Sequence, residues 1–104
     1  MLEELETALA STGYEFRHYG WSHAPSGTYG VYSEDSAQSL WAGSKMVNQS
    51  MQGTIDLFTR DDTDLPRTKV QTALASIEIA WYLNSIQYEE DTGYIHYEWV
   101  FEVV

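Results

Sequence analysis

The sequence predicts an α+β domain, in which a four- to five-stranded, mainly antiparallel sheet carries two helices packed on one face. Three observations support this prediction. Apolar residues recur at helical spacing in two segments, several other segments have the alternation or the β-branched and aromatic composition of strands, and 104 residues is the length of one domain. The predicted order is helix, two strands, one long strand, helix, two strands, within a single domain covering residues 1–104.

The N-terminal third predicts a short helix and two strands. An apolar stripe at helical spacing marks the helix: Leu2, Leu5, Ala8 and Leu9. Gly13 suits the left-handed position that commonly follows a helix end. Residues 14–19 are aromatic and predict a strand, and residues 20–27 hold a proline and two glycines and predict a loop. Residues 28–33, rich in tyrosine and valine, predict the second strand.

The middle of the chain predicts a loop and then a long strand. Residues 34–44 contain serine, alanine and glycine around a lone Leu-Trp pair, and we expect a long exposed loop or hairpin tip there. Residues 45–59 predict a long strand, with a kink expected at Gly53. Its second part, residues 54–59, has the β-branched and aromatic composition of a half-buried strand.

Three aspartates follow that strand within four positions: Asp61, Asp62 and Asp64. Such a cluster can bind a cation, but an EF-hand loop needs a central glycine that is missing here. Apolar residues at helical spacing follow instead: Val70, Ala73, Leu74 and Ile77. Pro66 suits the first turn of that helix. We therefore predict that the aspartates end the strand and cap the helix, satisfying its free amide groups.

The C-terminal segment predicts a hairpin. Residues 80–90 and 94–104 are strand-like and flank a turn in which Gly93 supplies a positive φ. In the second strand, one set of alternate residues is apolar and is predicted to face the core: Ile95, Tyr97, Trp99, Phe101 and Val103. The other set is predicted to face solvent: His96, Glu98, Val100 and Glu102.

Charge and composition exclude several classes of function. Sixteen acidic and five basic residues give a formal net charge of −11, which argues against a protein that grips DNA, because such binding needs clustered lysine and arginine. Cysteine is absent, which excludes disulfides and thiol chemistry. The N-terminal segment lacks the basic and apolar regions of a signal peptide, and no apolar stretch is long enough for a membrane helix. We expect a soluble protein.

No group of residues has the spacing of an active site. His18, His23 and His96 are scattered, although His96 and Glu98 share a strand face and form a weak candidate pair of metal ligands. Glu34 and Asp35 are neighbours on a strand end and point apart, which does not suit an acid–base pair. Neither a nucleophile elbow nor a glycine-rich phosphate loop occurs. We expect no enzyme activity, no metal and no cofactor.

Four stretches together resemble the tail terminator proteins (also called tail-completion or minor neck proteins) of long-tailed bacteriophages and prophages of Gram-positive bacteria. These stretches are FRHYGWSHAPSGTYGVYSED, GTIDLFTRDDTD, VQTALASIEIAWYLNS and QYEEDTGYIHYEWVFEVV. The resemblance covers nearly the whole chain and lies in the order and texture of the segments rather than in one diagnostic motif.

The resemblance implies a virion structural protein that is made in the host cytoplasm and forms a hexameric ring at the head-proximal end of the tail tube. There it would end tube polymerisation and join the tail to the head, with the tube protein and the head connector as partners. DNA would pass through the bore without specific binding, repelled by acidic residues. No cofactor is implied.

By position, residues 34–52 match the variable hairpin or loop of that family and are the candidate interface with a neighbouring subunit or the tube. Its candidate interface residues are Leu40, Trp41, Lys45 and Met46. An exposed tryptophan is a liability in a monomer, so Trp41 is expected either to bury on assembly or to fold back over its own sheet.

Two other functions stay open at this point. A head-side connector or stopper protein has a similar size and pattern. A small acidic inhibitor that mimics DNA and binds a host enzyme would suit the charge of −11. Against mimicry, the acidic residues are spread along the chain, and the aromatic content exceeds what mimicry needs.

Overall fold

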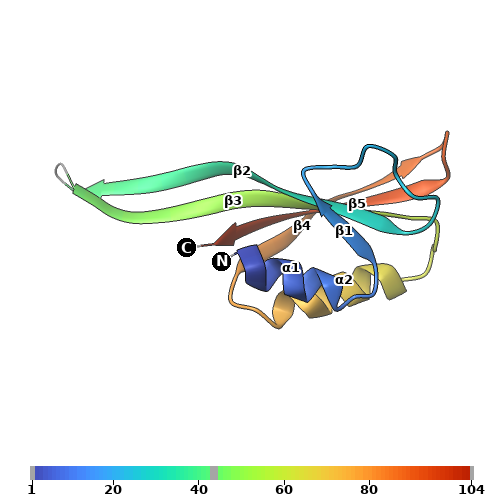
Figure 1. Ribbon diagram of the computed structural model, residues 1–104, viewed down its shortest axis with the longest axis horizontal. Helices are drawn as coiled ribbons and strands as arrows, with labels where there is room; N and C mark the ends of the chain where they lie inside the picture. The colour runs from blue at the N-terminus through green and yellow to red at the C-terminus, as the bar shows by residue number, and fades with distance from the viewer. Residues whose placement is uncertain (1, 43–44, 104) are drawn as a thin grey trace.

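The computed structural model describes the backbone of residues 2–42 and 45–103, and the side chains of residues 2–35 and 51–103. The elements follow in the order α1 (Leu2–Ala10), β1 (Glu15–His18), β2 (Tyr29–Ala42), β3 (Lys45–Thr59), α2 (Leu65–Ala75), β4 (Ala80–Glu89) and β5 (Tyr94–Val103). They form a five-stranded sheet in the order β1-β2-β3-β5-β4 (Figure 1).

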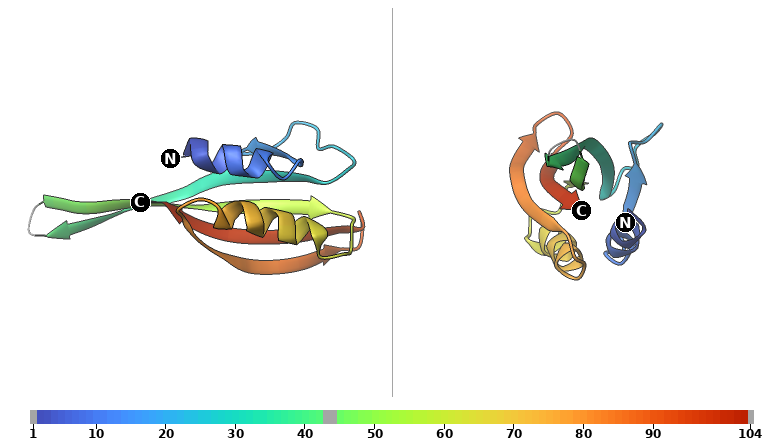
Figure 2. Two further views of the ribbon diagram at one scale, coloured as in Figure 1. Left: turned by 90° about the horizontal axis from the view of Figure 1, so that it is seen from below. Right: turned by 90° about the vertical axis from the view of Figure 1, so that its left-hand side faces the viewer.

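The sheet is mixed but mostly antiparallel. The β1 strand pairs in parallel with β2, whereas the β2–β3, β3–β5 and β4–β5 pairs are antiparallel. Both helices lie on the same side of the sheet in Figure 1, and the two views of Figure 2 agree. The predicted α+β fold and the predicted order of elements are therefore confirmed, and the parallel pairing of β1 is an addition that the sequence did not indicate.

The core lies between the helices and the central strands. Its largest fully buried side chains include Trp99 and Phe101 of β5, Ile55 and Leu57 of β3, and four helical residues: Leu5, Leu9, Val70 and Leu74. Their burial favours folding, because removal of apolar area from water is the dominant favourable contribution. The predicted inward set of β5 is confirmed, since Tyr97, Trp99, Phe101 and Val103 are buried and Ile95 packs against them.

The predicted glycine turns agree with the backbone, whereas the end of the second helix does not. Gly13 after α1 and Gly93 in the β4–β5 turn have φ values of 84° and 77°, which glycine adopts at little cost. The second helix is shorter than its apolar pattern suggests, because α2 ends at Ala75 and Ser76 is its C-cap. Ile77 therefore lies beyond the helix, although it still packs against the core.

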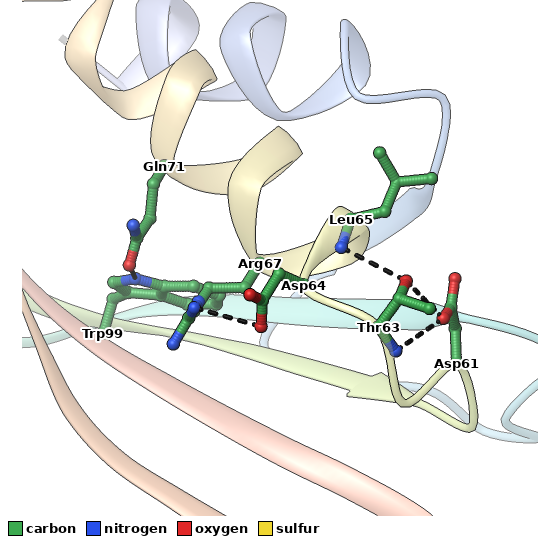
Figure 3. A network of polar contacts seen from close by, with 7 residues as sticks. All are labelled: Asp61, Thr63, Asp64, Leu65, Arg67, Gln71 and Trp99. Atoms are coloured by element: carbon green, nitrogen blue, oxygen red, sulfur yellow. Dashed lines mark hydrogen bonds and ion pairs between the residues drawn. The ribbon is translucent and has the colours of Figure 1, made fainter.

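The aspartate segment is a turn and helix start, as predicted, but the cap is built differently (Figure 3). Asp64 occupies the N-cap position, yet its carboxylate makes no capping hydrogen bond and instead pairs with Arg67 at 3.1 Å. The Leu65 N–H donates to the Thr63 hydroxyl, 3.3 Å away, and the Thr63 N–H donates to the Asp61 carboxylate at 2.9 Å. Asp64 therefore holds the predicted N-cap position, but the prediction that its carboxylate satisfies a helix amide is wrong. Asp61 binds the amide of Thr63, which belongs to the turn before the helix.

Residues 34–44 were predicted to be a long exposed loop or a hairpin tip; the loop is wrong for most of this length, and the hairpin is correct but its strands extend further than expected. The β2 strand continues to Ala42 and the β3 strand begins at Lys45, so the two form one long hairpin whose tip, residues 43–44, lies outside the described part. Serine, alanine and glutamine have low strand propensity, and pairing with the predicted strand opposite overrides it. The long strand predicted over residues 45–59 is confirmed.

At the end of the sheet remote from the hairpin tip, two side chains bind the loop between β1 and β2 to the rest of the sheet. Residues 19–28 connect β1 to β2, and the Tyr94 hydroxyl lies 3.2 Å from the Pro25 carbonyl oxygen and 3.0 Å from that of Gly27. The Arg60 guanidinium donates to the carbonyl oxygens of Ser26, at 2.6 Å, and Thr92, at 2.8 Å. It also lies 4.0 Å from the centroid of the Tyr94 ring. These contacts fasten the connecting loop to the β4–β5 hairpin.

Candidate assembly interface

The outer part of the β2–β3 hairpin projects from the body of the protein as a two-stranded ribbon (Figure 1). The β5 strand pairs with β3 only between Met51 and Thr59, and β1 pairs with β2 only between Tyr29 and Tyr32, among the residues described. Backbone pairing between β2 and β3 continues to Ala42 and Lys45. We call residues 36–42 and 45–50 the ribbon; it accounts for the elongated dimensions of 51 × 26 × 23 Å.

The ribbon leaves the body at an irregular position. The β2–β3 register shifts between Glu34 and Ser36, opposite Gly53, which is typical of a β-bulge. A Cβ atom on Gly53 would clash with the Phe101 ring and with the Ser33 carbonyl oxygen. Glycine therefore lets the buried phenylalanine pack directly against the β3 backbone where the ribbon begins. The irregularity lies in β2, opposite this glycine, and the kink predicted in β3 itself stays a prediction.

Two acidic side chains fix the ribbon root through hydrogen bonds. His18 hydrogen-bonds the Glu34 carboxylate, which also accepts from the Tyr19 hydroxyl at 3.4 Å. The hydrogen bond from His18 holds the pKa of Glu34 below its ordinary value. One residue further, Asp35 accepts a hydrogen bond from the Thr54 hydroxyl of β3. Glu34 and Asp35 therefore have separate partners, and both contacts hold the β2 strand in place.

The predicted interface residues all belong to the ribbon backbone. Leu40 and Trp41 lie on β2, Lys45 and Met46 on β3, and Trp41 is paired in register with Met46. The structure thus brings these four positions together near the tip. Their side chains are outside the described part of the chain, so the alternatives predicted for Trp41 stay predictions.

Sequence reasoning missed a second exposed apolar region on β4. This strand lies at the edge of the sheet, and Tyr82, Ile86 and Tyr88 are 57%, 51% and 65% exposed. Ile86 and Tyr88 lie on the same side of the strand, two residues apart. The sequence did contain a signal for this exposed apolar region, because only one of the 10 residues of β4, Glu89, is charged. Long apolar edge strands are uncommon, since they invite pairing with another chain.

The sheet face opposite the helices carries a row of polar pairs. His96 lies 2.7 Å from Asp56, and the Asn84 amide donates to Glu98 at 2.6 Å. The hydrogen bond with Asp56 raises the pKa of His96, while partial burial opposes that shift. The His96 ring stacks on Phe58 with centroids 4.3 Å apart. His96 and Glu98 therefore have separate partners and do not converge as a pair of metal ligands.

No group of three or more histidine and carboxylate side chains is placed to hold a metal ion among the described residues. Within the same ranges, no helix is both long and apolar enough to cross a membrane. A surface groove beside α1 is lined mainly by glutamate, serine and threonine side chains without a histidine base near them.

Comparison with known proteins adds no assignment. The sequence matches neither a protein-family model nor a curated protein.

Proposed function

We propose that this protein is a virion structural protein of a long-tailed phage, of the tail-terminator type. In this role it forms a ring, with six subunits expected, at the head-proximal end of the tail tube. The ring ends tube polymerisation and presents a surface to the head connector. The proposal combines the resemblance noted in the sequence with the shape of the molecule.

The observation that carries the proposal is the projecting ribbon. An isolated two-stranded hairpin is marginally stable in water, and this one extends past the last β3–β5 pair at Met51. A ribbon of this kind gains stability when another chain covers it. The predicted interface positions near its tip, Leu40, Trp41 and Met46, are apolar, which suits such an arm.

The acidic character fits a ring through which DNA passes. Asp35, Asp56, Glu98 and Glu102 belong to strands of the sheet, where Asp56 and Glu98 are paired in register. If acidic residues line the bore, they repel the phosphates and keep DNA from sticking. Replacing them with lysine should slow genome ejection, and unchanged ejection kinetics would argue against this part of the proposal.

The test is electron microscopy of lysates from a phage that lacks this gene. Tail termination predicts full heads with detached tails, some of them overlong or ragged at the upper end. Tails of normal length beside sealed, full heads would assign the protein to head–tail joining alone, as expected of a head-side stopper. Normal infectious particles would refute a structural role.

The second candidate, an acidic inhibitor of a host enzyme, is favoured only by the net charge of −11. A pull-down from host lysate separates the two proposals, because an inhibitor should capture one nucleic-acid enzyme stoichiometrically and a neck protein should not.

A further inference from the structure

We infer that the ribbon of one copy adds to the exposed edge of β4 in the next copy and extends its sheet across the subunit boundary. The inference rests on the proposed function, because it names the surface that receives the ribbon in the ring. It also stands on observations of its own, which concern backbone edges, length, charge and symmetry.

Both surfaces present unpaired backbone. The β4 strand is the last strand of the sheet, so one of its two edges has no neighbour among the described strands. The β1 strand pairs with β2 only as far as Tyr32, so among the described strands the outer edge of β2 has no neighbour over the ribbon residues 36–42. Free N–H and C=O groups on two strands can form a new ladder, the mode of recognition called β-augmentation.

The β4 edge is long enough to receive the ribbon. The β4 strand has 10 residues, which suffices to pair with all of residues 36–42, the β2 part of the ribbon. The exposed side chains of β4 are apolar at Tyr82, Ile86 and Tyr88. A partner that covers them would remove apolar area from water, which favours association.

Charge selects a second copy as the occupant. Sixteen acidic residues are spread through the chain, yet none falls in residues 36–50, where Lys45 is the single charged residue. The edge of β4 ends beside the acidic turn that contains Glu89, Glu90 and Asp91. Two copies with a net charge of −11 repel each other through most of their surfaces, and contact between the ribbon and the β4 edge avoids much of that repulsion.

This contact has the symmetry that a ring needs. The ribbon and the β4 edge are different parts of the surface, so each copy gives a ribbon to one neighbour and receives one from the other. Such a heterologous contact closes into a ring or continues as a filament. A ribbon-to-ribbon contact or a β4-to-β4 contact would instead be isologous and would stop at a dimer.

The test uses two complementary variants of the full-length protein. The edge variant, Ile86→Lys with Tyr88→Lys, keeps the ribbon and places charges on exposed positions of β4, where lysine discourages strand pairing. The ribbon variant replaces residues 38–50 with Asn-Gly, which joins the paired residues Ala37 and Met51 by a two-residue turn. The matched control, Leu65→Lys with Thr68→Lys, makes the same charge change on exposed positions of α2.

Sedimentation velocity at several hundred micromolar should give self-association of the wild type and the control, and monomers for each variant alone. When the two variants are mixed, the ribbon of the edge variant can still bind the intact β4 edge of the ribbon variant. The mixture should therefore give a 1:1 heterodimer and no larger species. Hydrogen exchange should then show new protection in residues 80–89 of the ribbon variant and not in its helices.

Three results would overturn the inference: an edge variant that self-associates like the wild type, a mixture that forms no heterodimer, or a wild type that stays monomeric. The proposed function is judged separately, by the tails of the phage that lacks the gene. If the phage that lacks the gene has abnormal tails but the edge variant assembles normally, the proposed function would stand and the inferred contact would be wrong. The ring would then form through another contact.

Discussion

The two ends of the β2–β3 hairpin differ sharply in what surrounds them. In the body, β3 lies between β2 and β5, and Ile55 and Leu57 are fully buried in the core. In the ribbon, the same two strands pair with each other and project from the body (Figure 1). The comparison teaches that strand pairing alone does not require a core: the body is held by buried side chains, whereas the ribbon is the part that we propose makes contact with another chain.

The largest effect should come from breaking the body. Trp99→Ala removes a fully buried indole whose N–H donates to the Gln71 side chain at 3.1 Å (Figure 3). We expect a loss of about 3–5 kcal/mol in the free energy of unfolding, because the change loses burial and leaves a cavity. Urea unfolding measures it.

The control for this prediction is Tyr82→Ala on the exposed edge strand, which should cost far less. A Trp99→Ala protein as stable as the Tyr82→Ala protein would show that the core is not where we place it.

The second effect concerns the point where the body meets the ribbon. Gly53→Val places a side chain against the Phe101 ring and the Ser33 carbonyl oxygen, and we expect it to destabilise the protein by about 1–3 kcal/mol. Gly27→Ala is the control, because its Cβ meets nothing within 4 Å. Thermal unfolding of the two variants compares them, and equal melting temperatures would contradict the close packing at Gly53.

A smaller loss of stability should follow from weakening the contacts of the loop between β1 and β2, residues 19–28. Tyr94→Phe removes the hydroxyl that faces the carbonyl oxygens of Pro25 and Gly27, and it should cost about 1 kcal/mol. Hydrogen exchange in residues 20–28 should become faster while exchange in β5 changes little. Tyr88→Phe, at a position 65% exposed, should leave both properties unaltered. Equal exchange in the two variants would mean that the hydroxyl does not hold the loop.

A pH series should separate the body from the ribbon root. The pKa of His96 is raised from its ordinary value of 6.5 by the hydrogen bond with Asp56, so protonated His96 stabilises the fold. This contribution is complete below that ordinary value and is lost as pH rises through the raised pKa. We expect His96→Gln to lower stability by at most about 1 kcal/mol in acid, with the deficit shrinking in base. Urea unfolding across the neutral range measures it, and a deficit that grows with pH would contradict the pairing.

Glu34 at the ribbon root should respond in the opposite direction. Its pKa is lowered by the hydrogen bond from His18, so its contribution is complete above the ordinary pKa of a glutamate and is lost as pH falls through the lowered value. The deficit caused by Glu34→Gln should therefore disappear at acidic pH. A deficit that persists there would indicate a role for Glu34 other than charge.

The sequence predicted most of the body and the β3 half of the ribbon, but not the β2 half of the ribbon. Alternation in β5 and helical spacing around Val70 depend on local pattern, so they identified the elements correctly. The strand over residues 34–42 depends on its partner in β3, because serine and alanine carry no β preference of their own. The exposed edge of β4 follows from the strand order, which local patterns do not encode. The prediction that the Asp64 side chain caps α2 was wrong because the Thr63 hydroxyl accepts from the Leu65 N–H, while the Asp64 carboxylate pairs with Arg67.

The smallest effect on stability should come from removing the ribbon itself. Replacing residues 38–50 with Asn-Gly keeps every pairing of β3 with β5, since that ladder begins at Met51. We expect a change of less than about 1 kcal/mol, because a lone two-stranded ribbon contributes little net stability. Urea unfolding of the variant beside the wild type measures this change, and sedimentation should show that assembly is lost. A loss as large as that of Trp99→Ala would mean that the ribbon supports the core. The division between a folding body and a contacting ribbon would then be wrong.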